Sequence, residues 1–80
     1  MKLTRRPTDV EIRQHLREWF LHLQRKWKLN DQEMAEAVGI SQTMVTTIKQ
    51  VGDPGIDTLV GLHYAFRESM SRMVSEDPPW

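Results

Sequence analysis

Apolar residues recur along the first third of the chain at intervals of three or four positions. They are Ile12, Leu16, Phe20, Leu23 and Trp27. This spacing is typical of one face of an α-helix, and no glycine or proline interrupts residues 8–29. Thr8 and Glu11 have the spacing of a capping box, which predicts that this first helix begins just after Thr8.

A second, much shorter helix is predicted to begin at Asn30. Asn is a favoured N-cap residue, and Glu33 stands where its side chain can bond back to the cap backbone. The apolar positions that follow are Met34, Ala35 and Val38. Gly39 comes next, where a left-handed residue commonly ends a helix. Because so short a helix is unstable alone, we expect it to pack on its neighbours.

Only Ile40 separates this glycine from Ser41, which can cap a third helix that extends to about Gln50. Val45 and Ile48 lie about one turn apart and predict the buried side of this helix. The other positions are polar apart from one methionine, and mostly uncharged: Gln42, Thr43, Met44, Thr46, Thr47, Lys49 and Gln50. Since adjacent threonines are poor helix formers, helix propensity does not explain this face.

Two further helices are expected in the last part of the chain. Residues 51–55 contain a cluster of glycine, aspartate and proline, which is typical of a loop. A fourth helix is predicted over Ile56–Phe66, and a short fifth helix over residues 69–74. The predicted buried side of the fourth helix consists of Leu59, Leu62, Ala65 and Phe66.

The chain has 80 residues, which is enough for one domain and too short for two. We expect a compact all-α domain of five helices over residues 8–74, between a flexible basic arm (residues 1–7) and an irregular tail (residues 75–80). The sequence has no cysteine, which excludes disulfides and thiolate metal sites and fits a reducing cytoplasm. No apolar run is long enough for a transmembrane helix, so we expect no contact with a membrane.

The net charge of zero conceals an uneven distribution of charge. Residues 1–28 contain eight Lys or Arg against three Asp or Glu, whereas residues 29–80 contain three against eight. A basic half is compatible with phosphate binding, and the asymmetry is equally compatible with head-to-tail self-association.

The join between the second and third helices is the feature most informative about function. A capped helix, a Gly-Ile-Ser turn and another capped helix predict a compact corner that holds the third helix outward. The DNA major groove accommodates one helix, and Gln and Thr can hydrogen-bond to base edges or contact thymine methyl groups. The face of the third helix therefore indicates binding to duplex DNA, with a plain solvated helix surface as the alternative.

This stretch of sequence resembles the lambda-repressor-like (Cro- and Xre-type) helix-turn-helix family. The family's pattern is a Leu, a small polar cap, an aliphatic-Ala pair, then Gly, an aliphatic residue and Ser or Thr. These positions are Leu29, Asn30, Met34-Ala35, Gly39, Ile40 and Ser41. The aliphatic pair of the recognition helix falls on Val45 and Ile48, and the loop proline on Pro54. The resemblance covers about residues 16–66 and implies a helix-turn-helix over residues 30–50.

The resemblance also implies which side chains meet DNA. Base contacts would come from Gln42, Thr43, Thr46 and Thr47. Phosphate contacts would come from Lys28, Asn30, Gln32, Lys49 and Gln50. Asp31 departs from the family, in which many members have a glutamine that touches the DNA backbone, and a carboxylate there would repel phosphate. Lys49 and Val51 also depart, standing where the family has an acid and a glycine.

The expected function is that of a sequence-specific transcriptional regulator, a repressor that binds double-stranded DNA as a homodimer. The fifth helix is the expected dimer interface, through Met70, Met73 and Val74, although the same methionines can instead cover the domain's own core. A different class stays open, in which the same fold is an antitoxin-like or adaptor module that binds a protein partner. The neutral overall charge favours that alternative.

Nothing in the sequence indicates catalysis, a metal or a cofactor. It contains no phosphate-binding glycine loop, no cysteine and no Ser-His-acid arrangement at a usable spacing. His15, His22 and His63 lack a metal-ligand spacing, and Trp19 and Trp27 are interpreted as core or edge packing. We therefore do not expect an enzyme.

Overall fold

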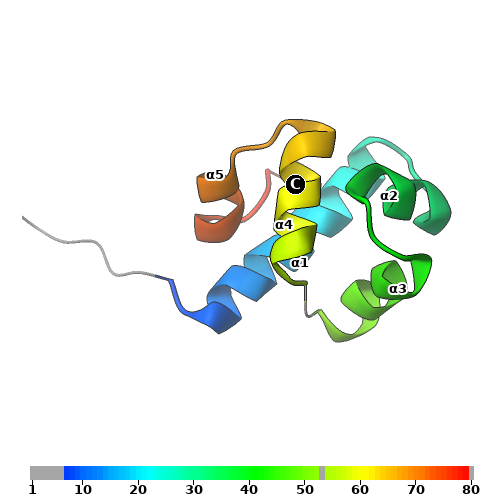
Figure 1. The fold of residues 1–80 in the computed structure, drawn as a ribbon. Helices are drawn as coiled ribbons and strands as arrows, with labels where there is room; N and C mark the ends of the chain where they lie inside the picture. Colours follow the sequence, from blue (N-terminus) through cyan, green and yellow to red (C-terminus); the bar gives the residue numbers. More distant parts are fainter. Residues whose placement is uncertain (1–6, 53, 80) are drawn as a thin grey trace, which may run out of the picture.

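The computed structural model describes residues 7–52 and 54–79, which form five α-helices and no strand (Figure 1). The helices are α1 (Asp9–Lys26), α2 (Asp31–Val38), α3 (Gln42–Val51), α4 (Ile56–Phe66) and α5 (Met70–Ser75). The prediction of a compact all-α globule of five helices is confirmed. The predicted basic arm lies outside the described residues, apart from Pro7.

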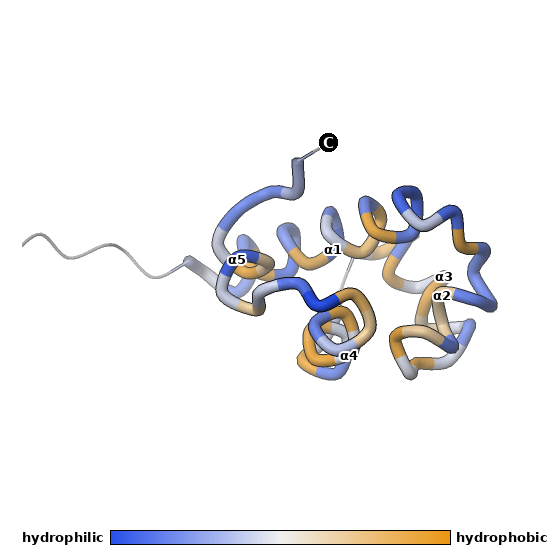
Figure 2. The backbone as a smooth tube through the Cα atoms, turned by 90° about the horizontal axis from the view of Figure 1, so that it is seen from above, coloured by the Kyte–Doolittle hydropathy of each residue, from blue (hydrophilic) through white to orange (hydrophobic). Residues whose placement is uncertain are grey.

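The long helix α1 is the central element of the fold. It contacts α3, α4 and α5, and α4 also contacts α2 and α5. Figures 1 and 2, which view the molecule from directions 90° apart, show α5 near one end of α1 and the α2–α3 pair near the other, with α4 between them. Among the described residues, no helix has both the length and the apolar character needed to span a membrane.

Side-chain caps account for where the helices begin. The Thr8 hydroxyl accepts from the Glu11 backbone N–H at 3.2 Å, and the Asn30 side chain accepts from the Glu33 N–H at 2.8 Å. In both pairs the glutamate side chain bonds back to the cap, so both predicted capping boxes are confirmed. The Ser69 hydroxyl accepts from the Arg72 N–H and caps α5. This helix therefore begins at Met70, one residue later than predicted.

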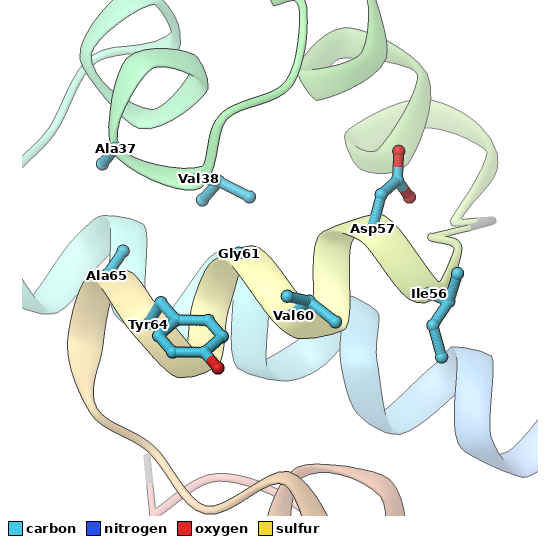
Figure 3. A pocket seen from close by; sticks show the side chains of 8 residues that line it. All are labelled: Ala37, Val38, Ile56, Asp57, Val60, Gly61, Tyr64 and Ala65. Carbon is cyan, nitrogen blue, oxygen red and sulfur yellow. The ribbon is translucent and has the colours of Figure 1, made fainter.

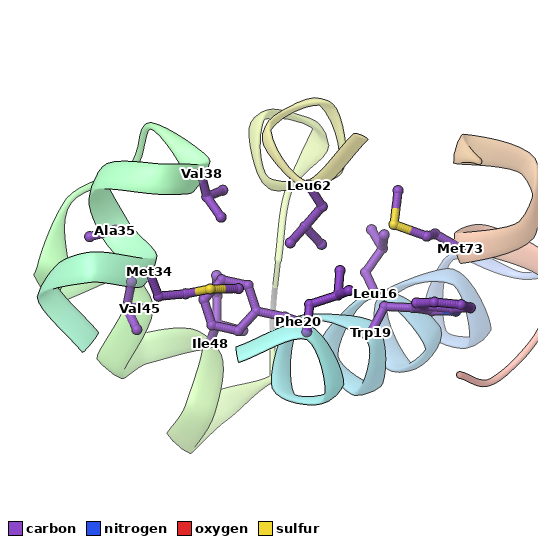
Figure 4. Close-up of a cluster of buried hydrophobic side chains, with 11 residues drawn as sticks. Leu16, Trp19, Phe20, Met34, Ala35, Val38, Val45, Ile48, Leu62 and Met73 are labelled. Carbon is purple, nitrogen blue, oxygen red and sulfur yellow. The ribbon is translucent and has the colours of Figure 1, made fainter. Parts of the chain in front are cut away.

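One hydrophobic core joins all five helices (Figure 4). Its buried residues are Leu16, Trp19, Phe20, Leu23, Met34, Ala35, Val38, Val45, Ile48, Leu62 and Met73. The predicted apolar stripe of α1 is fully buried only in its middle, because Ile12 at one end is half-buried and Trp27 at the other is exposed. The Trp27 ring stacks on Phe66 with centroids 6.4 Å apart, so this tryptophan packs at the edge of the fold.

The buried side of α4 differs from the predicted one. Leu62 is fully buried, Leu59 and Phe66 are half-buried, and Ala65 is exposed. Thr58 is fully buried instead, a position that the apolar pattern missed because threonine is counted as polar. The helix is therefore rotated so that part of its apolar surface faces outward.

Met73 is a second correction. Its side chain is fully buried, and Figure 4 shows it pointing from α5 toward the side chains of α1 and α4. The prediction that Met73 lies at a dimer interface is wrong, because this methionine covers the domain's own core and has no surface left for another chain. Its predicted companions Met70 and Val74 are half-buried.

The tail predicted to be irregular from residue 75 is irregular only from residue 76, because Ser75 ends α5, and it packs on α1. The Trp19 Nε1–H donates to the Glu76 carbonyl at 2.8 Å, and His15 Nδ1 lies 3.0 Å from the Val74 carbonyl oxygen. Pro78 is buried. The Trp19 hydrogen bond therefore joins the tail to α1, whereas His15 contacts α5, to which Val74 belongs.

Candidate nucleic-acid interface

The connection between α2 and α3 is a tight turn over residues 39–41. Gly39 has φ 82° and donates its N–H to the Ala35 carbonyl at 2.8 Å, which ends α2. A Cβ at Gly39 would meet no atom within 4 Å, so the backbone conformation alone explains the glycine. The Ser41 hydroxyl accepts from the Met44 N–H at 3.1 Å and starts α3. The corner predicted from the caps is present.

Helix α3 is attached to the core by one side only. Val45 and Ile48 are fully buried, as predicted. Its outer side exposes mainly amide and hydroxyl groups, together with the Met44 side chain. The exposed residues of this surface are Gln42, Thr43, Met44, Thr46 and Gln50. Thr47 was predicted with this set but is half-buried, so it lies at the edge of the surface.

Two threonines of α3 use their hydroxyl protons within the helix. Thr46 donates to the Gln42 carbonyl at 3.3 Å, and Thr47 donates to the Thr43 carbonyl at 3.0 Å. Each hydroxyl oxygen keeps its capacity to accept a hydrogen bond. The exposed Thr46 therefore offers a methyl group and an acceptor, which suits a thymine methyl or an amino group on a base edge.

Arg17 of α1 holds the far end of α3. Its Nη2 donates to the Lys49 carbonyl oxygen at 2.9 Å. This places a cation at the negative end of the α3 dipole. Gly52 caps α3 with φ 73°, and a Cβ there would lie 2.5 Å from Arg17 Cδ. Arg17 therefore joins two elements in a way that no local pattern in the sequence could indicate.

Lys49, predicted to bind phosphate, is paired within the chain. Its Nζ lies 2.9 Å from Asp31 Oδ1 at the start of α2, and Gln24 Nε2 donates to the same oxygen at 2.9 Å. The hydrogen bond from Lys49, followed by that from Gln24, lowers the pKa of Asp31 below its usual value. The carboxylate expected to repel phosphate is thus compensated by a cation, and the pair ties the start of α2 to the end of α3.

Three of the other residues predicted to bind phosphate surround the start of α2, whereas Gln50 is exposed near the end of α3. Lys28, Asn30 and Gln32 are all exposed. The Asn30 oxygen is occupied by the Glu33 N–H, so its side chain serves the cap first. Lys28 and Lys49 line one shallow surface hollow together with Arg25, which adds a third cation to the predicted set. Basic side chains from α1 and α3 therefore gather beside the positive end of the α2 dipole.

No protein-family model matches this sequence, and neither a curated protein nor a solved structure matches the chain.

Proposed function

We propose that the chain is a lambda-repressor-like helix-turn-helix protein that binds duplex DNA in a sequence-specific manner and represses transcription. The observation that supports this is the outer surface of α3, which presents amides, hydroxyls and methyl groups. Lys49 is the one charged residue of α3, and it is engaged by Asp31. A surface built only for solubility is usually rich in Glu and Lys, whereas an uncharged polar surface can match base edges.

In this proposal α3 enters the major groove. Gln42 reads an adenine edge through two hydrogen bonds, and Thr43 and Thr46 contact neighbouring bases, with Thr47 at the margin. The exposed Met44 adds an apolar contact to the same surface.

Phosphates flank the start of α2 in the proposed complex. Lys28, Asn30 and Gln32 would contact one strand, together with the N–H groups at the positive end of the α2 dipole. Lys49 and Gln50, at the end of α3 beside the start of α2, would contact the backbone close by. In the cytoplasm, the protein would repress transcription by occupying a DNA site that RNA polymerase must also bind. A homodimer would read two half-sites about one DNA turn apart.

Selection of binding sites from randomised duplexes, at near-physiological salt, tests the proposal. We expect one sequence to be enriched and to bind about a thousandfold tighter than a scrambled duplex of the same composition. If no sequence is enriched, even at low salt where phosphate contacts are strongest, the proposal is rejected.

That negative result would favour the antitoxin-like or adaptor function. The feature that supports this second candidate is the excess of acid in residues 29–80, which suits a basic protein partner.

A further inference from the structure

Helix α4 exposes an apolar stripe on its outer side. Ile56, Val60 and Tyr64 follow one another at four-residue intervals and are 76%, 38% and 74% exposed. They line a surface groove of about 510 Å³ between α4 and the end of α2, in which Figure 3 shows Val38 facing Gly61. Contiguous apolar surface of this kind marks an interaction site more often than scattered exposed residues do.

The groove exists because α2 and α4 approach closely at Gly61. A Cβ at this position would clash with the Val38 carbonyl oxygen and with the Val38 side chain. Leu62, the next residue, is fully buried in the core. The register of α4 is therefore held by close packing on its inner side, which leaves Val60 and Tyr64 facing outward.

We infer that a second copy of this chain covers the stripe, with the two α4 helices antiparallel across a two-fold axis beside Val60. This inference rests on the proposed function and names its partner subunit. The stripe is centred on Val60, with a larger side chain one turn away on each side. Antiparallel pairing therefore brings Val60 against Val60 of the second copy and Ile56 against Tyr64 of the second copy, which fills the interface evenly.

The charges at the two ends of α4 also favour a second copy in this orientation. Asp57 lies in the first turn and lines the groove, and the exposed Arg67 caps the last turn. In this register Asp57 lies about one turn along the axis from Arg67 of the second copy, within reach of the long arginine side chain, whereas parallel helices would place like charges together. One helix face is smaller than the roughly 800 Å² per partner of a standard interface, so the free dimer is weak and DNA strengthens it by holding two copies together.

Sedimentation equilibrium of the DNA-free chain over a range of concentrations tests the inference. We expect a reversible dimer, and Val60→Glu should raise its dissociation constant at least about tenfold, because two carboxylates would meet at the axis. Val10→Glu is the matched control, an exposed valine on α1 that should change the constant less than about twofold. A mixture of Val60→Glu and Val60→Lys chains should form a heterodimer. A wild-type chain that stays monomeric, or a Val60→Glu chain that dimerises normally, would overturn the inference.

If Val60→Glu does not fold, a second pair of variants tests the antiparallel dimer. Asp57→Arg and Arg67→Asp should each weaken the dimer, and the two together in one chain should restore it. No restoration would overturn the antiparallel arrangement.

DNA binding and dimerisation are measured separately, so failure of one proposal can be distinguished from failure of the other. A monomeric Val60→Glu chain that still prefers its selected half-site supports both proposals. A wild-type monomer that shows sequence preference overturns the dimer alone, and a wild-type dimer without sequence preference rejects only the proposed DNA-binding function.

Discussion

Helices α3 and α4 are nearly equal in length, with 10 and 11 residues, but their exposed sides have opposite chemistry. Each buries one side in the same core, through Val45 and Ile48 in α3 and through Leu62 in α4. The outer side of α3 is mostly amides and hydroxyls, with Lys49 as its one charge and Met44 and Val51 as exposed apolar residues, whereas that of α4 is an apolar stripe. Two helices of one small domain can therefore be suited to different partners, a polar groove for α3 and an apolar surface for α4.

The two helices also differ in how they are held. The end of α3 is fastened by polar contacts, from Arg17 to the Lys49 carbonyl and from Lys49 to Asp31. In contrast, α4 is held by the close approach of Gly61 to Val38. Loss of a polar contact should shift α3 slightly, whereas added bulk at Gly61 should displace α4.

The largest expected effect comes from removing the anchor of α3. Ile48→Ala empties a fully buried site and should lower the free energy of unfolding by about 2–5 kcal/mol, measured by urea denaturation. Val51→Ala is the control, an exposed aliphatic residue on the same helix whose truncation should cost less than about 0.5 kcal/mol. Equal costs for the two variants would show that α3 does not depend on its buried side.

A smaller effect is expected where α4 meets α2. Gly61→Ala adds a methyl group against the Val38 backbone, which should cost about 3 kcal/mol, offset by about 1 kcal/mol from the better helix propensity of alanine. Gly39→Ala meets no neighbouring atom and should cost only the strain of its left-handed backbone, about 1 kcal/mol. Calorimetric unfolding checks both values, and an unchanged stability for Gly61→Ala would contradict the close approach.

The smallest effect on stability is expected from Asp31→Asn. Asp31 and Lys49 are both partly exposed, so their pair should contribute less than about 1 kcal/mol at neutral pH. Because folding lowers the pKa of Asp31, its contribution is present above the unfolded-state pKa and is lost as the pH falls through the folded-state value. The wild type should therefore be the more stable protein at pH 7, and the two should converge in thermal unfolding experiments only as the pH falls through the lowered folded-state pKa of Asp31.

Asp31→Asn should also change how the affinity for DNA depends on salt concentration. Asp31→Asn removes a carboxylate and releases Lys49, so the plot of log affinity against log salt should steepen by about 0.9, the value for one phosphate contact. Glu68→Gln makes an equal change in charge in the connection between α4 and α5 and should leave this slope unchanged. Identical slopes for the two variants would show that Lys49 stays away from phosphate.

Most of the local structure could be predicted from the sequence because its determinants are close together in the chain. Thr8 with Glu11 and Asn30 with Glu33 act over three residues, and Gly39 acts through its own φ angle. The burial of Val45 and Ile48 follows from helical periodicity. The exposed surface of α3 follows from the same two anchors, with Thr47 as the partial exception.

The remaining features depend on how distant helices meet, and no spacing in the sequence records that. Arg17 and Lys49 are 32 positions apart, and Lys49 and Asp31 are 18 apart. The burial of Met73 and the outward stripe of α4 likewise depend on the rotation of each helix against α1 and α2. The prediction that placed Met73 at an interface failed because a methionine that packs inward and one that packs against a partner produce the same pattern.

The most direct measurement of the central claim is the discrimination ratio of the double variant Gln42→Ala, Thr46→Ala. This ratio is the affinity for the selected duplex divided by that for a scrambled duplex, at one salt concentration. The account predicts a fall of about a hundredfold, since each base contact contributes about 1–3 kcal/mol, with thermal stability preserved because both side chains are exposed. Gln14→Ala, an exposed glutamine on α1, should leave the ratio unchanged. A double variant that discriminates as well as the wild type would contradict the assignment of α3 as the helix that reads DNA.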